Sequence, residues 1–243
     1  MKLYLDKDWF IDTSSFIDLS IGISPNGVRA WYLNSPRITP VMENGFIGSV
    51  AEGGAVNFRD IYFNPHGHGT HTESHGHIST DVYPVSQCFN QFFFDAQLIT
   101  IIPTIIGADR VITADQLACV QPGEALLIRT EPNHQNKCTM NYSDTNPTYM
   151  DVACVSKLNE CGIKHLLVDM PSVDREVDGG ALAFHHAFWN VPDAPILDRT
   201  ITELIFVPSE VEDGSYVLEL QLANFTNDAA PSRPLLYQKR KEA

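Results

Sequence analysis

Short runs of apolar residues, each bounded by turn residues, follow one another along most of the chain. Runs of this length, rich in aliphatic and aromatic side chains, predict β-strands. The predicted strands cover residues 16–21, 46–50, 92–102, 125–129, 165–169, 202–207 and 216–222. The pattern therefore indicates a chain that is built mainly from short strands.

Two segments carry helix signals instead. Residues 114–120 follow Thr113, a good N-cap residue, and Gln116 occupies the capping-box position. Residues 149–161 end at Gly162, a typical C-cap glycine, and lead into an apolar stretch. A helix that feeds a buried strand is a step of an α/β layer. Because no repeat or low-complexity linker is visible, we expect one β-rich α/β domain with few helices over residues 1–243.

Composition and charge narrow the classes of function. The 243 residues are 44% hydrophobic, which is enough for a sizeable core. A net charge of −14, with no basic patch beyond the short tail 239–241, argues against nucleic acid as a partner. The most apolar stretch, 98–108, is too short to span a membrane. Five cysteines without CxxC spacing and a charged N-terminal segment lead us to expect a cytoplasmic protein.

Five of the nine histidines fall within residues 66–77, together with Glu73. Imidazole is the commonest protein ligand for zinc and related ions, and a carboxylate adds an oxygen donor. The HExxH helix motif is absent, so we expect the strip to be extended or looped. On a strand, His71, Glu73, His75 and His77 would share one face. We therefore predict a divalent metal site here, and the alternative is a polar loop that holds no ion.

Residues 69–77, with the sequence GTHTESHGH, resemble the signature H-x-G-T-H-x-D-x-P-x-H of the cyclase family, which includes bacterial kynurenine formamidase and isatin hydrolase. Further segments are similar to family motifs and occur in the same order: Asp18-Leu19-Ser20, residues 122–130 (PGEALLIRT) and residues 169–174 (DMPSVD). The resemblance runs from about residue 18 to residue 203. It implies the swivelling β/β/α type of fold and a metal-dependent hydrolase.

The resemblance also implies roles for single residues. His71 and Glu73 match metal ligands. His185 and Glu203 match ligands of a second ion, with Glu73 bridging the two ions. His77 matches the catalytic histidine, which moves protons.

The first histidine of the family signature has no counterpart at the same spacing. It lies four residues before the second histidine, where this chain has Gly67. His66 supplies the ligand if Gly67 absorbs a bulge, and we favour this assignment. His68, with one residue fewer in the spacing, is the alternative.

Other positions differ from the family or leave a choice open. Glu73 replaces an aspartate, which lengthens the bridging side chain, and His75 replaces a proline. His186 lies beside His185 and is an alternative ligand. Trp31 lies in an early loop where the family places an aromatic substrate contact, and the alternative is an ordinary core or surface tryptophan.

The resemblance implies an enzyme, a metal-dependent amidohydrolase of arylformamidase type that acts on non-peptide C–N bonds. It would use a metal-activated water and a histidine proton shuttle to cleave a small amide, either an arylformamide or a lactam. Zinc or manganese is the expected cofactor, with one or two ions per chain. The alternatives are a lactone, ester, dehydration or cyclisation reaction at the same site, or a non-catalytic metal-binding scaffold. The expected partners are a small-molecule substrate and further copies of the chain, as a homodimer or homotetramer.

Overall fold

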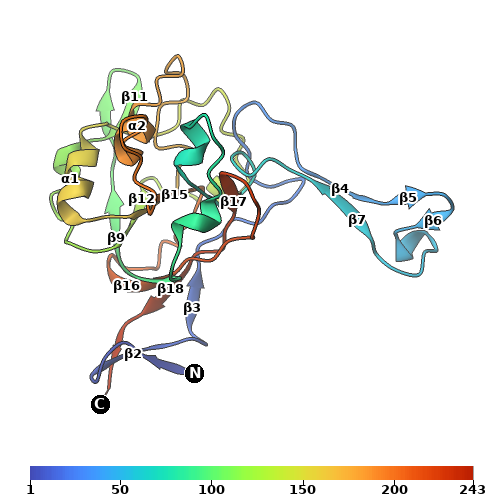
Figure 1. Ribbon diagram of the computed structural model, residues 1–243, viewed down its shortest axis with the longest axis horizontal. Helices are drawn as coiled ribbons and strands as arrows, with labels where there is room; N and C mark the ends of the chain where they lie inside the picture. The colour runs from blue at the N-terminus through green and yellow to red at the C-terminus, as the bar shows by residue number, and fades with distance from the viewer. Residues whose placement is uncertain (243) are drawn as a thin grey trace.

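A nine-stranded mixed sheet forms the centre of the computed structural model, which describes residues 1–242 (Figure 1). Its strands, in spatial order, are β17 (Ala229–Pro231), β8 (His71–Glu73), β15 (Thr200–Glu203), β14 (His165–Val168), β12 (Ala125–Thr130), β9 (Phe93–Ile101), β16 (Gly214–Glu219), β18 (Leu235–Gln238) and β3 (Phe16–Asp18). The strands β9, β12, β14 and β15 are parallel, and the flanking strands pair antiparallel. Every residue of β12, β14 and β15 is buried, as is typical of parallel strands covered on both faces.

The remaining strands form four small sheets. One joins the two ends of the described chain and contains β1 (Lys2–Tyr4), β2 (Trp9–Asp12) and β19 (Arg240–Lys241). A second contains β10 (Thr104–Ile106), β11 (Asp109–Ile112) and β13 (Tyr149–Met150). The last two are the pairs β4 (Arg37–Pro40) with β7 (Arg59–Tyr62) and β5 (Met42–Glu43) with β6 (Phe46–Ile47).

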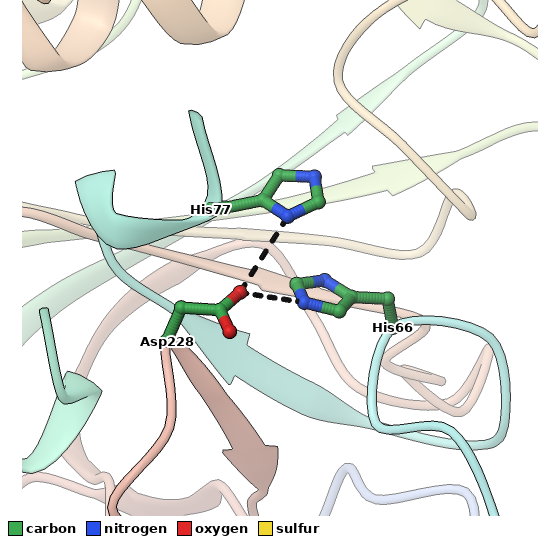
Figure 2. A group of neighbouring side chains, drawn as sticks. All are labelled: His66, His77 and Asp228. Carbon is green, nitrogen blue, oxygen red and sulfur yellow. Dashed lines mark hydrogen bonds and ion pairs between the residues drawn. The ribbon is translucent and has the colours of Figure 1, made fainter. Parts of the chain in front are cut away.

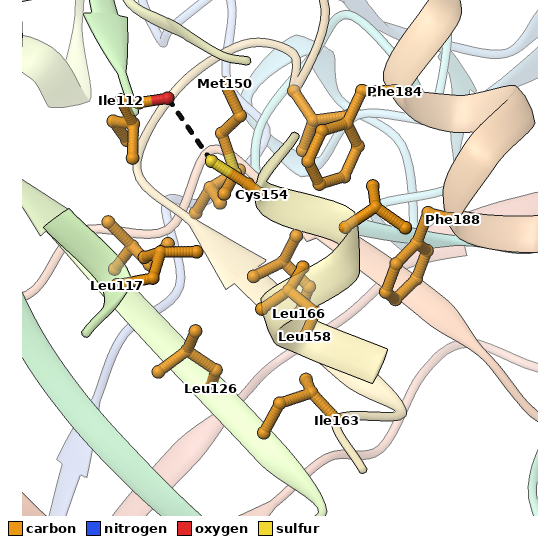
Figure 3. Packing of buried hydrophobic residues seen from close by; sticks show 14 of the residues in the cluster. Ile112, Leu117, Leu126, Met150, Cys154, Leu158, Ile163, Leu166, Phe184 and Phe188 are labelled. Carbon is orange, nitrogen blue, oxygen red and sulfur yellow. Dashed lines mark hydrogen bonds between the residues drawn. The ribbon is translucent and has the colours of Figure 1, made fainter. Parts of the chain in front are cut away.

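Two α-helices, α1 (Cys154–Cys161) and α2 (Ala183–Trp189), pack against one face of the parallel strands (Figure 3). Leu126 and Leu166 of the sheet belong to this cluster, whereas the next residues, Leu127 and Leu167, belong to the cluster on the other face. Short 3-10 turns complete the structure: η1 (Val50–Glu52), η2 (His75–Ile78), η3 (Val85–Cys88), η4 (Ala114–Leu117) and η5 (Gln135–Cys138). None of the helices within residues 1–242 has the length and apolar character needed to cross a membrane.

The predicted fold class, a β-rich α/β domain with few helices, is confirmed. The predicted strands at 92–102, 125–129 and 165–169 correspond to β9, β12 and β14, and those at 16–21, 202–207 and 216–222 overlap β3, β15 and β16 with shifted ends. The helix predicted at 114–120 is only the turn η4, although its capping box is present. The helix predicted at 149–161 begins at Cys154, because its first residues form β13. Helix α2 was missed, since seven residues are too few to show a helical period.

Residues 37–62 form an arm that projects from the body of the molecule (Figure 1). The strands β4 and β7 pair along its stem, and β5 and β6 pair nearer its tip. The predicted strand at 46–50 lies in this arm, where only Phe46–Ile47 is a strand. The arm exposes large apolar side chains: Met42, Phe46, Val50, Val56, Phe58, Ile61 and Tyr62.

His165, at the start of β14, makes stability depend on pH. Its ring is buried beside Phe89 and Phe94, and its Nδ1 lies 2.8 Å from the hydroxyl of Thr200. Burial lowers the pKa of His165 from 6.5 to about 4. The unfolded chain binds this proton at a higher pH than the folded chain. The contribution of the neutral His165 to the free energy of unfolding is therefore fully present above about pH 6.5 and is lost as the pH falls toward 4.

We expect the wild-type free energy of unfolding to fall by about 2 kcal/mol more than that of His165→Gln between pH 7 and pH 5. The glutamine keeps a polar side chain at the position but does not titrate. Urea unfolding of both proteins at the two pH values measures the difference. Equal losses in the two proteins would contradict the assignment to His165.

Candidate metal centre

Strand β8 places His71 and Glu73 on the same side of the sheet. The strand lies between β15 and β17, and its residue pairs include Glu203 with His71 and Ile201 with Glu73. His71 and Glu73 are two residues apart on a strand, so their side chains point in one direction. They are 0% and 1% exposed. The strip is therefore extended at this point, and it presents two donor side chains to the interior.

The extended conformation ends with β8, and the prediction that His75 shares a face with His77 is wrong. Ser74 begins the turn η2, and its hydroxyl oxygen accepts the Gly76 N–H at 3.2 Å. Gly76 passes so close to Tyr83 that a Cβ at this position would lie 2.5 Å from the Tyr83 nitrogen. The ring of His75 packs on Tyr83, with centroids 4.4 Å apart. The turn therefore sends His75 away and brings His77 toward the site.

Of the two histidines that were alternatives for the first ligand, His66 lies at the centre. Its Nδ1 is 2.9 Å from Glu73 Oε2. The ring of His68 is held by backbone groups instead: Nδ1 accepts the Asn64 N–H at 2.8 Å, and Nε2 donates to the Asn34 carbonyl at 2.9 Å. The geometry therefore brings His66 next to Glu73 and directs His68 elsewhere.

Helix α2 contributes His185 and not its neighbour. His185 Nε2 lies 3.0 Å from Glu73 Oε1, and its Nδ1 lies 2.6 Å from Asp174 Oδ2. The Nδ1 of His186 faces the Val191 carbonyl at 3.0 Å, away from the cluster. Asp174 was part of a motif in the sequence, but no role was predicted for it.

Glu203 comes from the end of β15, the strand beside β8. Its Oε1 accepts the Val173 N–H at 3.1 Å, and its Oε2 lies 3.4 Å from His71 Nε2. A loop, two strands and a helix thus bring together the five ligands predicted from the sequence: His66, His71, Glu73, His185 and Glu203.

The cluster is rich in carboxylates whose ion-pair partners are all histidines. Within residues 1–242, Glu73, Glu203, Asp174 and Asp228 pair with imidazoles and with no lysine or arginine. Burial favours the neutral form of His185, but the carboxylates of Asp174 and Glu73 outweigh it and raise the pKa of His185 to about 10. So many poorly solvated negative charges favour a cation among them.

The donor atoms meet the requirements of a divalent ion. Those of His66, His71 and Glu73 lie within 4.8 Å of one another, and so do those of Glu73, His77 and His185. His71 Nε2 is buried and has no hydrogen-bond partner within the described residues. Imidazole nitrogens with carboxylate oxygens suit zinc, manganese and iron. The residues present therefore fit a metal ion, and this donor set leaves the identity of the ion open.

A cleft of about 180 Å³ opens beside the cluster, and its walls include Trp31, His77, Leu182 and Glu203. Trp31 has φ 60°, a left-handed backbone that is uncommon for a bulky residue. Strained conformations of this kind are concentrated at binding and catalytic sites. A larger surface cleft of about 630 Å³ lies elsewhere, near Trp9, and contains none of the donor residues. The smaller cleft is therefore the candidate substrate site.

Fold and site together define the class: a β-rich α/β protein with a histidine–carboxylate cluster suited to a metal, beside a small cleft. The chain belongs to the cyclase family, because the family model described as "Putative cyclase" matches residues 17–175. The family resemblance of the sequence is thereby confirmed.

Solved structures share the fold over most of the chain. Isatin hydrolase A from Labrenzia aggregata aligns with a TM-score of 0.68 and 13% identity, over 92% of this chain and 93% of that chain. A potential metal-dependent hydrolase with cyclase activity aligns with a TM-score of 0.64 and 16% identity, over 92% and 97%. A predicted metal-dependent hydrolase from Bacillus stearothermophilus aligns with a TM-score of 0.62 and 16% identity, over 92% and 98%. At such identities the likeness shows the fold alone, and no curated protein sequence matches the chain.

Proposed function

We propose that this chain is a metal-dependent hydrolase that cleaves a C–N bond in a small amide of the arylformamide or lactam type. The observation that carries the proposal is that one cleft borders on the buried donor cluster, on His77 and on Trp31. A hydrolase needs these three elements in contact: a Lewis acid, a proton carrier and a surface that holds the substrate. The choice of an amide rests on the fold shared with isatin hydrolase A.

We propose His66, His71, Glu73, His185 and Glu203 as the residues that hold one or two divalent ions. Glu73 is suited to a bridging position, because Oε2 faces His66 and Oε1 faces His185. When bound, zinc or manganese supplies a Lewis acid that polarises a carbonyl and lowers the pKa of water toward ~7.

His77 is the proposed proton carrier. Its Nδ1 lies 3.6 Å from Asp228 Oδ2, so Nε2 is the nitrogen free to exchange protons with substrate and water (Figure 2). An imidazole can take a proton from water and return it to a leaving nitrogen. Trp31 and Leu182 offer an apolar wall for an aryl group.

The test uses protein that is stripped of metal and reloaded with zinc or manganese. An N-formyl arylamine, a lactam and a lactone are offered to the loaded and the stripped forms. Hydrolysis of the formamide or the lactam by the loaded form alone supports the proposal. Turnover of the lactone alone would assign the site to ester chemistry. Metal binding without turnover of any of these substrates would favour a metal-binding scaffold.

We also propose that the arm binds a second copy of this chain. The arm exposes a run of large apolar side chains, and such patches mark association surfaces. It carries two basic and three acidic residues, although the whole chain has a net charge of −14. Because the arm is close to neutral, two copies that make contact through their arms experience little charge repulsion there.

We expect light scattering to give a dimer or tetramer mass for the wild type and a monomer mass for the double variant Phe46→Asp/Phe58→Asp. Ile105→Asp, at an exposed apolar position outside the arm, is the matched control and should keep the wild-type mass. A monomeric wild type at micromolar concentration would contradict the proposal.

A further inference from the structure

Asp228 lies outside every motif of the sequence, yet the sheet places it at the metal centre. It directly precedes β17, which pairs with β8 so that Ala229 lies opposite Glu73. The Asp228 carbonyl accepts the Ser74 N–H at 2.9 Å, and the Asn227 carbonyl accepts the Val85 N–H at 2.9 Å. Backbone hydrogen bonds on both sides therefore fix this carboxylate next to the histidine strip.

The carboxylate of Asp228 faces two imidazoles with the same oxygen (Figure 2). Asp228 Oδ2 lies 2.8 Å from His66 Nε2 and 3.6 Å from His77 Nδ1. The two rings are stacked, with centroids 4.1 Å apart and planes inclined by 28°. The side chain of Asp228 is 16% exposed, so water competes little for these contacts.

We propose that Asp228 is the positioning residue that orients both histidines for the proposed hydrolysis. By accepting the N–H at His66 Nε2, it leaves His66 Nδ1 directed at Glu73, as a metal ligand needs. The negative charge of Asp228, 3.6 Å from His77 Nδ1, favours a proton on that nitrogen and leaves His77 Nε2 free to exchange a proton with the substrate. A carboxylate that receives the second N–H of an imidazole fixes both its tautomer and its ring orientation.

The geometry favours this role over direct coordination by Asp228. The donor atoms of His66, His77 and Asp228 lie within 4.8 Å of one another, so a further ion is the competing interpretation. However, His66 Nδ1 faces Glu73 and His66 Nε2 faces Asp228, and the two nitrogens of an imidazole ring point in different directions. An ion held by His66 Nδ1 and Glu73 therefore lies on the side of the ring that Asp228 does not face.

The inference rests on the proposed function, so its test combines measurements that need catalysis with measurements that do not. Asp228→Asn and Asp228→Glu are compared with Asp193→Asn, an exposed aspartate outside the cluster. Zinc affinity is measured by titration calorimetry, the His77 tautomer by ¹⁵N NMR of the imidazole, and kcat and KM on whichever amide the wild type hydrolyses.

For Asp228→Asn we expect kcat and zinc affinity each to fall by about 10–100-fold, with KM unchanged and a mixed His77 tautomer. Asp228→Glu should recover part of kcat, and Asp193→Asn should match the wild type. Loss of one whole ion per chain, with the remaining ion bound normally, would make Asp228 a ligand and overturn the proposal. Unchanged kcat, affinity and tautomer would also overturn it.

A failure of the proposed function is recognised separately. If the wild type binds zinc but hydrolyses no amide, the reaction is wrong, and zinc affinity and tautomer still decide the role of Asp228. If the wild type binds no zinc, the metal centre itself fails. The His77 tautomer in the metal-free protein then decides whether Asp228 orients that ring.

Discussion

Replacing His71 with alanine is expected to lower metal affinity by about 10²-fold or more and to abolish hydrolysis. The side chain is completely buried, and its Nε2 has no hydrogen-bond partner within the described residues. Zinc held by four ligands binds with roughly 10–16 kcal/mol at neutral pH, so one ligand is worth about 3 kcal/mol, or about 10²-fold in affinity. Elemental analysis after dialysis against a weak chelator measures the loss.

The matched control is His68→Ala. His68 belongs to the same strip, but its ring bonds to the backbone of Asn64 and Asn34 and contacts no carboxylate of the cluster. This variant should keep its metal. A full metal content in His71→Ala would remove His71 from the metal site, and equal losses in the two variants would point to disruption of the loop.

Replacing His77 with alanine is expected to lower kcat by about 10²–10⁴-fold and to leave metal content close to that of the wild type. The imidazole is the only titratable side chain proposed to carry the proton, so no other group takes over its role. The side chain is 31% exposed, and its truncation opens no large internal cavity. Steady-state kinetics on the amide that the wild type cleaves, with metal content measured in parallel, tests this expectation.

His134→Ala is the control, because it removes an exposed imidazole that lines a different cleft. It should leave kcat unchanged. An unaltered kcat in His77→Ala would exclude His77 as the proton carrier. Loss of an ion in that variant would instead make His77 a ligand.

The sequence alone predicted the part of the centre that lies on one short segment. His71 and Glu73 are two residues apart on a strand, and this period alone predicts that they point together. The prediction from strand alternation is wrong at His75, because the chain turns there: Ser74 caps the turn η2, and Gly76 passes close to Tyr83. That contact joins residues of a turn and a later loop, and no local pattern encodes it.

The rest of the centre depends on tertiary contacts. The choice between His66 and His68 follows from which backbone groups lie next to each ring, and the sequence alone left it open. Asp228 carried no signal at all, since it reaches the centre only through the pairing of β17 with β8. The roles proposed for these residues remain predictions, although their positions are now described.

The place of β8 between β15 and β17 also has a consequence for biosynthesis. The histidine strip leaves the ribosome long before the strands at residues 200–203 and 229–231 that enclose it. Contacts between segments so distant in the chain form late and slowly. Until those strands pair with β8, His71 and Glu73 lack the neighbours that enclose them in the folded chain. We therefore expect a chain that stops before residue 228 to carry most of the proposed donor side chains without the enclosed centre that the complete sheet provides.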